Sequence, residues 1–431
     1  MATISKAIAG APPSRQDIIL LIFIIDSIKK ASQGQRVRYV RSCRRESSLP
    51  TTKAWTACEP PMTGSPPTQP HFLSMSPEDY RNLALSLGEP SYRAHQLVEW
   101  IFKKGAVSPD EMTNLSRPLR RTLTETLDWS LPHLVEEQDS PDGATKMLLS
   151  NRKNQYMEAV ILRYEGRTSL CVSSQVGCKL ACSFCQTGKL GFFSNLGVAE
   201  ILGQFVMASR RVRQEGRRIS HVVFMGMGEP LDNYAAAVKA TNLLIGEDAF
   251  GLSNRHVTIS TSGIAPKIVE LARDSRASLA VSLHAANDTL RSELMPINRK
   301  YSLSELKDAI KAWQKATLKK ITIEYILIAG KNCDQQHANE LVRFLSGLKA
   351  KVNLIPFNAH PGLPYERPGA EEIRAFQTYL ASRSIPAPVR YSLGLDVSAA
   401  CGQLAAKKAP ELALAPERRR ALHVPAVHSS N

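Results

Sequence analysis

The chain has 431 residues, 8 cysteines, a formal net charge of +16 and a sequence pI of about 9.5. This length suits one large domain with appendages, and the positive charge favours a polyanionic partner such as nucleic acid. No apolar run is long enough to span a bilayer, and so few cysteines without a secretory signal argue against a disulfide-built scaffold.

Residues 1–73 differ from the rest of the chain, since they are rich in Ala, Ser, Pro, Lys and Arg. A basic cluster, RVRYVRSCRR, occupies 36–45, and the apolar run from Ile18 to Ile25 is too short for a transmembrane helix. A basic, hydroxyl-containing leader with few acids is typical of an organelle transit peptide. We therefore expect a plastid protein, with the mitochondrion or the cytoplasm as alternatives. A disordered basic tail that helps to hold nucleic acid is the other interpretation.

Residues 74–130 predict a small helical domain. A helix is expected to start at Ser76, because Pro77 suits the first helical position and acidic residues follow it. Apolar residues recur at helical spacing over 88–105, and 108–127 predicts one or two further short helices. Three arginines give these helices a basic outer face: Arg117, Arg120 and Arg121. We expect this accessory domain to dock RNA; a plain packing unit with solvated charges is the alternative.

Residues 131–406 alternate between strand-like and helical patterns. Alternating apolar residues over 132–175 predict strands, and helical segments then separate five apolar, β-branched runs. These runs are 219–226, 256–261, 278–285, 321–328 and 352–357. Roughly six strand–helix units at this spacing predict an α/β fold with a partial (β/α)6 barrel, more open than an eight-stranded one. Residues 407–431 predict a disordered tail.

Four cysteines lie in one short stretch, CVSSQVGCKLACSFC, from Cys171 to Cys185. The last three, Cys178, Cys182 and Cys185, have the spacing C-x3-C-x2-C, which can turn three thiolates toward one point. Three thiolates hold three irons of a cubane iron–sulfur cluster and leave the fourth iron open to bind a substrate. A structural zinc site would need a fourth ligand, and the nearest candidate, Cys171, is predicted to lie on a strand. Buried thiols without a metal are the remaining alternative.

Small polar residues gather where the predicted strands end. The strand ends read GMGEP at 226–230, STSG at 260–263, SLH at 282–284 and PFN at 356–358. Close-set glycines let a backbone approach a ligand, and Glu229 could accept hydrogen bonds from an ammonium group or a ribose. If these ends converge on one mouth, they can hold a nucleoside and an amino-acid carboxylate. Taken singly, each is more often a turn or a cap, and a lone His284 more often a structural histidine.

Cys401 stands among small residues near the end of the predicted barrel, in GLDVSAACGQL at 394–404. Its neighbours Ala400 and Gly402 would leave the thiol sterically open, as a nucleophile requires. A small cysteine buried in the core is the alternative interpretation.

Together these motifs carry a resemblance to a known family. C-x3-C-x2-C followed by a strand-end Gly-Glu-Pro resembles the radical S-adenosylmethionine (SAM) enzymes. More narrowly, LCVSSQVGCKLACSFCQTGKLGF, MGMGEPL, STSG, SLHA, IEY, NLIPFN and DVSAACGQL resemble the RlmN/Cfr family of 23S ribosomal RNA adenine methyltransferases. The match runs from about 75 to 406 and keeps the order of the motifs.

The resemblance implies a role for each matching residue. Cys178, Cys182 and Cys185 would hold a [4Fe-4S] cluster, whose open iron S-adenosylmethionine would chelate. The positions around that cofactor would be Gly228, Glu229, Ser260, Ser282, Leu283, His284 and Asn358. The catalytic residues would be Cys401, which is first methylated, its partner Cys171, and the proton acceptor Glu158.

The resemblance also implies the reaction, which is methylation of C2 of an adenosine in 23S rRNA; some relatives also methylate tRNA. Two S-adenosylmethionine molecules per turnover would methylate Cys401 and then activate its methyl group, so that protein and RNA become covalently linked. Attack by Cys171 on Cys401 would release the RNA and leave a disulfide, which an electron donor must reduce. A C8-directed methyltransferase and a catalytically silent RNA-binding relative are the alternatives. We expect a monomer with no membrane partner.

Overall fold

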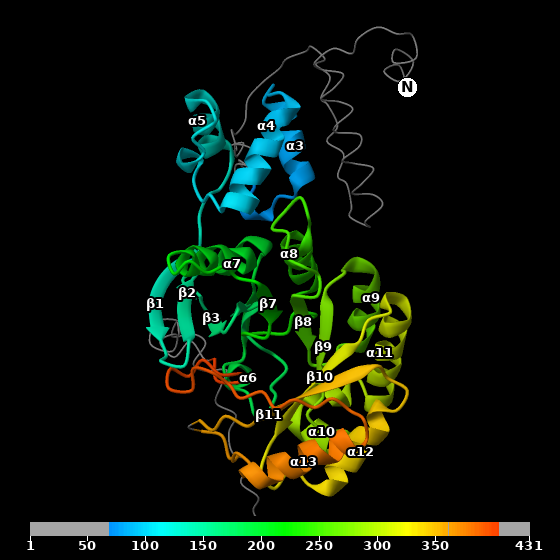
Figure 1. Ribbon diagram of the computed structural model, residues 1–431. Helices are drawn as coiled ribbons and strands as arrows, with labels where there is room; N and C mark the ends of the chain where they lie inside the picture. Colours follow the sequence, from blue (N-terminus) through cyan, green and yellow to red (C-terminus); the bar gives the residue numbers. More distant parts are fainter. Residues whose placement is uncertain (1–68, 361, 405–431) are drawn as a thin grey trace, which may run out of the picture. The chain divides into compact units, whose positions relative to one another are not determined.

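The computed structural model describes residues 69–360 and 362–404, which fall within one compact unit (Figure 1). The predicted transit leader, apart from residues 69–73, and the predicted tail at 407–431 lie outside the described residues. Within the described ranges, no helix is long and apolar enough to cross a membrane.

A helical module comes first. Its elements are η1 (Phe72–Ser74), α3 (Pro77–Ser86), α4 (Ser91–Val98), η2 (Glu99–Lys104), η3 (Pro109–Glu111) and α5 (Arg117–Thr126). The predicted helix start at Ser76 is confirmed, because Ser76 and Asp79 cap each other's backbone N–H groups at the start of α3. The predicted helix over 88–105 is α4, which continues into the π-helical turn η2 and ends at the left-handed Gly105.

Antiparallel strands follow the module and form one side of a large sheet. They are β1 (His133–Asp139), β2 (Ala144–Ser150), β3 (Tyr156–Tyr164) and β4 (Arg167–Cys171). β4 pairs in parallel with the next strand of the sheet, β7. Cys171 is therefore the last residue of the strand at which antiparallel pairing changes to parallel pairing.

The other side of the sheet is parallel. Its strands are β4, β7 (His221–Phe224), β8 (Val257–Thr261), β9 (Ser278–Ser282), β10 (Ile321–Leu327) and β11 (Ala350–Pro356), six in the described residues, in this spatial order. The intervening and following helices are α7 (Val198–Arg213), α8 (Tyr234–Ile245), α9 (Ala265–Asp274), α10 (Asp288–Leu294), η4 (Pro296–Arg299), α11 (Leu303–Thr317), α12 (Gln335–Leu345) and α13 (Ala370–Ser382). The predicted α/β fold with six parallel strands of a partial barrel is confirmed.

The helical module and the barrel share one hydrophobic core. Phe72, Leu97 and Ile101 of the module belong to the same cluster of buried side chains as Phe205 and Val222 of the barrel. Figure 1 shows α7 lying between the module and the strands, and α7 packs against η1. The module is therefore held to the barrel by apolar packing and not by a linker alone.

Candidate active site

The three cysteines of the C-x3-C-x2-C motif lie between β4 and α7. This segment contains β5 (Gln175–Gly177), α6 (Gln186–Lys189) and β6 (Phe192–Asn195). Cys178 directly follows β5, Cys182 lies in the next turn, and Cys185 is the N-cap residue of α6. All three are partly exposed and line one cavity of about 170 Å³, the central cavity.

Left-handed backbone shapes the turns that hold these cysteines. Gly177 has a φ of 73°, and a Cβ atom there would lie 1.9 Å from the carbonyl oxygen of Gly191. Ala181, directly before Cys182, has a φ of 52°. A non-glycine residue in this region is uncommon and persists where the surrounding structure imposes it, often at a functional site.

The environment of the three thiols fits a polynuclear iron–sulfur cluster. Burial raises the pKa of Cys178 to about 12 and also raises the pKa of Cys182, because a thiolate would lose hydration. Several thiolates can therefore coexist here only with bound cations between them. Among the described residues, no group of three His, Cys, Asp or Glu side chains is arranged to hold a metal ion in this structure. Cys171, the fourth ligand that zinc would need, does not line the cavity.

The carboxyl ends of β7, β8 and β9 form a wall of the central cavity. Five residues from the sequence motifs lie in that wall: Gly228, Glu229, Ser260, Ser282 and His284. Glu229 Oε1 accepts a hydrogen bond from the backbone N–H of Leu231 at 3.0 Å, and Oε2 accepts two from Ser262, both at 2.8 Å. Burial raises the pKa of Glu229, whereas these hydrogen bonds oppose that rise. Glu229 is thus a rigid buried acceptor beside the thiols.

The glycines before Glu229 allow the segment after β7 to pack closely against the segment after β4. A Cβ atom at Gly226 would lie 2.8 Å from the backbone nitrogen of Ser173, and one at Gly228 would lie 2.5 Å from the Gln175 side chain. Gly228 also has a φ of 100°. The close backbone approach expected at these glycines is therefore made by the segment that leads to the cluster cysteines, and not only by a ligand.

His284 follows β9 and links it to β10. Its Nδ1 accepts a hydrogen bond from the backbone N–H of Ile326 at 3.0 Å. Burial lowers the pKa of His284 to about 3, so the ring is neutral and its proton resides on Nε2. The ring also packs edge-on against Phe184, with ring centroids 4.8 Å apart. His284 is therefore a neutral hydrogen-bond donor at the cavity wall.

Two residues that the resemblance assigns to S-adenosylmethionine do not line the central cavity. Leu283 is fully buried, and its backbone N–H bonds to the carbonyl of Glu324. Asn358 donates to the Ser392 hydroxyl at 2.8 Å, while its buried Oδ1 has no hydrogen-bond partner among the described residues. A buried amide oxygen without a partner is costly, and a bound ligand would satisfy it.

Arg291, which the sequence analysis missed, fastens the strand ends together. It lies on α10, is fully buried, and donates to the carbonyls of Ser262, Ser282 and Leu283 at 2.7, 3.2 and 3.1 Å. It also bonds to Asn298 Oδ1 at 2.8 Å. These bonds connect the ends of β8 and β9, so Arg291 positions the cavity wall without lining it. From the sequence, only a location in a helical segment between two predicted strands was expected for this residue.

Cys401 lies on a loop that is anchored on both sides of it. Before the cysteine, the backbone N–H of Gly394 donates to Asp142 at 2.7 Å, and Ser140 donates to Asp396 at 2.6 Å. After it, the carbonyl of Gly402 accepts from the backbone of α6 at 2.8 Å. These contacts hold Cys401 against the segment that carries the cluster cysteines.

Cys401 lines the central cavity and has an exposed surface. Because the protein surrounds this position, desolvation raises the pKa of Cys401 to about 11, and the negative charge of Glu324 adds to the effect. Cys171 is buried in a cluster with Ala399 and Leu404, which flank Cys401. Burial and then a Cys401 thiolate raise the pKa of Cys171. Both cysteines are free thiols, so the disulfide expected between them is not formed in this structure.

Glu158 lies outside the central cavity, on β3. It lines a neighbouring cavity of about 240 Å³ together with Asp396 and Ser398 of the Cys401 loop. Its Oε1 is 3.9 Å from Nζ of Lys146, and both side chains are buried. Lys146 also donates to the carbonyl of Val397. Glu158 is therefore connected to the Cys401 loop through Lys146.

Glu324 is a second carboxyl group of the central cavity. It stands in the IEY motif on β10, is buried, and accepts a hydrogen bond from Asn353 at 2.9 Å. Burial raises the pKa of Glu324 from 4.5 to about 7, partly offset by this hydrogen bond. The sequence analysis matched the motif but gave this residue no role; an acid in the middle of an apolar strand was the available signal.

Three thiols beside the carboxyl ends of six parallel strands define a class, the radical SAM enzymes, and the comparisons agree. The model of the radical SAM superfamily matches residues 172–344. The model described as the ribosomal RNA large subunit methyltransferase N-terminal domain matches residues 71–128. Radical SAM enzymes use a [4Fe-4S] cluster and S-adenosylmethionine, and this chain does so as one of them.

The chain belongs to the RlmN family of radical SAM RNA methyltransferases. It is 44% identical to the dual-specificity RNA methyltransferase RlmN of Ruthia magnifica subsp. Calyptogena magnifica, over 78% of this chain and 95% of that protein. It is 45% identical to the RlmN of Marinomonas sp. (strain MWYL1), over 78% and 92%. It also matches the crystal structure of a radical SAM methyltransferase from Sphaerobacter thermophilus, with 42% identity, a TM-score of 0.75, and coverage of 78% and 99%.

Proposed function

We propose that this enzyme methylates C2 of an adenosine in 23S rRNA through a methylated Cys401. The observation that carries the proposal is that Cys401 lines the same cavity as Cys178, Cys182 and Cys185. A thiol that transfers carbon must lie beside the cofactors that activate it. The relatives named as dual-specificity RNA methyltransferases support tRNA as a second substrate.

In this proposal Cys178, Cys182 and Cys185 hold the [4Fe-4S] cluster. Glu229, Ser260, Ser282 and His284 orient S-adenosylmethionine, with Gly228 and Leu283 shaping the site and Asn358 offering its unpaired Oδ1. When bound, these cofactors supply a methyl group and the one-electron chemistry that activates it. The positioned acceptors and the neutral His284 donor are suited to the amino, carboxylate and ribose groups of such a ligand.

The protein's own residues then perform the remaining steps. Cys401 Sγ loses its proton, accepts the methyl carbon and carries that carbon to the adenine ring. Glu158 accepts the proton that C2 gives up. The thiolate of Cys171 attacks Cys401 Sγ, so that an S–S bond forms as the C–S bond breaks. The methylene carbon keeps the electron pair of that bond and takes up a proton to become the methyl group, and the RNA leaves. The product disulfide requires an external electron donor before the next turnover.

Residues 1–73 and the helical module complete the proposal. The basic leader supports import into a plastid, which a fusion of residues 1–73 to a fluorescent protein would test. The exposed Arg117 and Arg121 on α5 support RNA docking by the module. We also propose that the protein acts as a monomer, which light scattering of the purified chain would test.

The decisive experiment is methylation of a 23S rRNA fragment by anaerobically reconstituted protein, followed by mass mapping of the modified nucleotide. A mark at C2 is expected, whereas a mark at C8 would overturn the regiochemistry. In Cys171→Ala the RNA should stay attached to Cys401, because nothing releases it. An adduct band on a denaturing gel would show this. Cys333→Ala is the matched control, since Cys333 is buried outside the cavity.

A further inference from the structure

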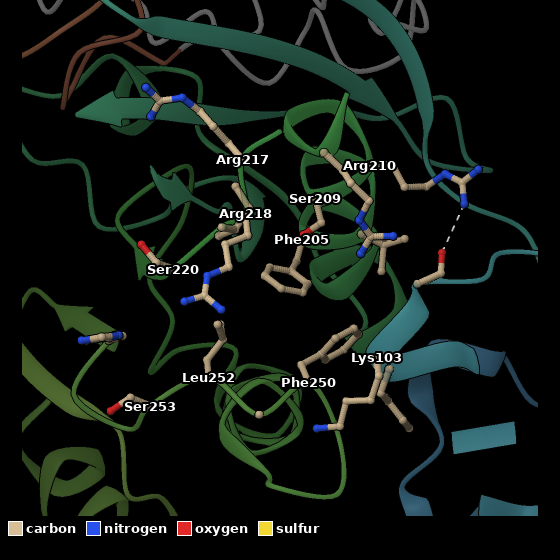
Figure 2. Close-up of a pocket in the computed structure, with 17 residues that line it drawn as sticks. Lys103, Phe205, Ser209, Arg210, Arg217, Arg218, Ser220, Phe250, Leu252 and Ser253 are labelled. Carbon is tan, nitrogen blue, oxygen red and sulfur yellow. Dashed lines mark hydrogen bonds between the residues drawn. The ribbon is translucent and has the colours of Figure 1, made fainter. Parts of the chain in front are cut away.

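A second pocket lies at the opposite end of the barrel strands from the central cavity. It is lined by the end of η2, the last turns of α7, and the segments that lead into β7 and β8. Its volume is about 450 Å³, within the range of small-ligand pockets. Figure 2 shows this pocket, which we call the basic pocket.

The lining of the basic pocket is strongly cationic. Five permanently charged residues contribute to it: Lys103, Arg210, Arg213, Arg217 and Arg218. No Asp or Glu is among the residues that line it. Positive charges gathered along one pocket attract an anion, and those that no acidic side chain neutralises are the ones available to bind it.

Arg218 is the cation that the protein itself does not engage. Arg210 pairs with Glu111 at 3.1 Å, and Lys103 donates to the carbonyl of Glu247 at 2.6 Å. Arg213 and Arg217 bond to carbonyl oxygens of Lys104 and Tyr164. Arg218 is exposed and makes no hydrogen bond or ion pair with the described residues. In Figure 2 its guanidinium group points into the pocket, while Arg217 points away.

The floor of the basic pocket is aromatic. Phe250 packs edge-on against Phe205, with ring centroids 4.9 Å apart, and against Phe102 at 5.0 Å. Phe205 and Phe102 are buried, whereas Phe250 and Leu252 are partly exposed. A planar base could therefore rest on Phe250 while its phosphate faces the arginines.

A buried hydroxyl group in the same wall has no partner. Ser209, on α7, lines the pocket, and its Oγ is inaccessible to solvent yet bonds to none of the described residues. In the middle of a helix, serine commonly satisfies its hydroxyl at a preceding carbonyl. Because this Oγ is closed off from solvent, a phosphate in the pocket would reach it only after a neighbouring side chain moved.

We propose that the basic pocket binds one nucleotide of the RNA substrate away from the methylated adenine, with its phosphate at Arg218 and its base on Phe250. This inference rests on the proposed function, because it takes RNA as the substrate. β7 has four residues, so its two ends are only about 13 Å apart. RNA that reaches both the central cavity and the basic pocket must therefore pass around the outside of the sheet, because the strands themselves fill the space between them.

The origin of the charges favours RNA over a free nucleotide. Sites for free nucleotides commonly present the backbone N–H groups of a helix N-terminus to the phosphate. Here the cations are side chains from the C-terminal turns of α7 and from the segment after it. Arginine and lysine side chains without a backbone cradle are typical contacts to a polynucleotide backbone.

The test compares RNA binding by the full-length wild type, Arg218→Gln and Arg255→Gln. Arg255 is exposed at the same end of β8 but does not line the pocket. Affinity for the 23S rRNA fragment is measured by fluorescence anisotropy at several salt concentrations. We expect Arg218→Gln to lose about tenfold in affinity at low salt and to reduce the salt slope by about 0.7 to 0.9. Arg255→Gln should change neither by as much.

Equal losses in the two variants, or none in Arg218→Gln, would overturn the inference. Arg218→Gln could instead lose binding of adenosine monophosphate while its RNA affinity stays unchanged. That result would assign the pocket to a free nucleotide and contradict the proposal that it binds RNA. As direct evidence, photocrosslinking of 4-thiouridine-labelled RNA should give a peptide containing Phe250 in the wild type and less of it in Arg218→Gln.

Methylation of Cys401 without RNA separates this inference from the proposed function. Mass spectrometry should show methyl-Cys401 in both the wild type and Arg218→Gln, because the basic pocket is remote from that thiol. Absence of methyl-Cys401 in the wild type would contradict the proposed function. If Arg218→Gln forms methyl-Cys401 normally and keeps the wild-type RNA affinity, only the proposed RNA binding by the basic pocket is contradicted.

Discussion

The two ends of the same parallel strands have opposite chemical character. At the carboxyl ends of β7 to β10, four thiols and two buried carboxyl groups surround a small cavity. At the amino ends of β7 and β8, arginines surround a larger pocket. At the carboxyl ends desolvation raises the pKa values of Cys401 and Glu324, whereas Arg218 at the amino ends is exposed. The strands are common to both ends, so the connecting segments decide what each end can do.

This difference separates the end of the barrel that performs the reaction from the end that we propose binds RNA. A thiol that forms a covalent bond with a base needs a site from which water is excluded. A group that holds a phosphate needs a charge that persists, which exposure preserves for arginine. Changes at the carboxyl ends should therefore alter reaction or stability, and changes at the amino ends should alter RNA affinity.

The largest effect is expected from Cys401→Ala, which removes the atom that carries the methyl carbon. RNA methylation should be abolished in a single-turnover assay, while affinity for RNA should remain at the wild-type level. Cys333→Ala should retain activity, because its thiol lies outside the central cavity. Residual RNA methylation in Cys401→Ala would contradict the assignment of the reaction to this thiol, since the carbon would then reach the base by another route.

Arg291→Leu should lower the free energy of unfolding by about 4 kcal/mol, because several buried carbonyl groups lose their donor. Urea unfolding measures this, and S-adenosylmethionine affinity should fall with it as the strand ends separate. Arg273→Leu is the control and should change stability little, since Arg273 is exposed and forms its ion pair with the adjacent Asp274. A comparable loss of unfolding free energy in both variants would mean that the hydrogen bonds of Arg291 do not stabilise the cavity wall.

Glu324→Gln should change the pH dependence of stability. In the folded protein the pKa of Glu324 is about 7, whereas the unfolded chain ionises near 4.5. The folded state therefore binds the extra proton between these values, and this contribution is present below pH 4.5 and lost as pH rises through 7. Relative to wild type, Glu324→Gln should gain on the order of 3 kcal/mol between pH 4.5 and 8.

Urea unfolding at pH 4.5, 6 and 8 tests this, with Glu125→Gln on the exposed face of α5 as the control. A constant difference between wild type and Glu324→Gln across these pH values would rule out a raised pKa for this carboxyl group.

Lys146→Met should have the smallest effect of the four. It removes the cation beside Glu158 and one anchor of the Cys401 loop, so we expect a roughly tenfold slower methylation step with unchanged RNA affinity. Lys153→Met, on the exposed turn after β2, is the matched control. A loss of RNA affinity in Lys146→Met would mean that the carboxyl ends of the strands also contribute to RNA affinity. The two ends would then differ less in function than we infer.

Local patterns were enough to predict some of the fold. The cap at Ser76, the helix over 88–105 and the run of parallel strands follow from side-chain spacing and from residues that favour helix starts. The cysteine spacing likewise predicted a tight loop that can turn three thiolates toward one point. The conformation of that turn depends on Gly177 and Ala181, whose positive φ values the spacing does not reveal.

Other features could not be predicted, because they join distant segments. Arg291 acts on carbonyl groups from two strands, and Lys146 reaches the loop before Cys401, 251 positions away. The basic pocket draws on η2, α7 and the segments before β7 and β8, none of which has a motif by itself. Even Gly228, which a motif singled out, is required by a contact with Gln175 that only the folded chain reveals.

The amino-acid sequence by itself determined the fold class, the three clustered thiols and the presence of a further open cysteine, because these depend on spacing along the chain. Tertiary structure decided that Cys401 shares their cavity, that Glu158 lines a neighbouring cavity, and that cations from η2, α7 and the segment after α7 line a pocket at the amino ends of the strands. Burial, charge repulsion and hydrogen bonding act through space, so their balance at each residue exists only once the chain has folded.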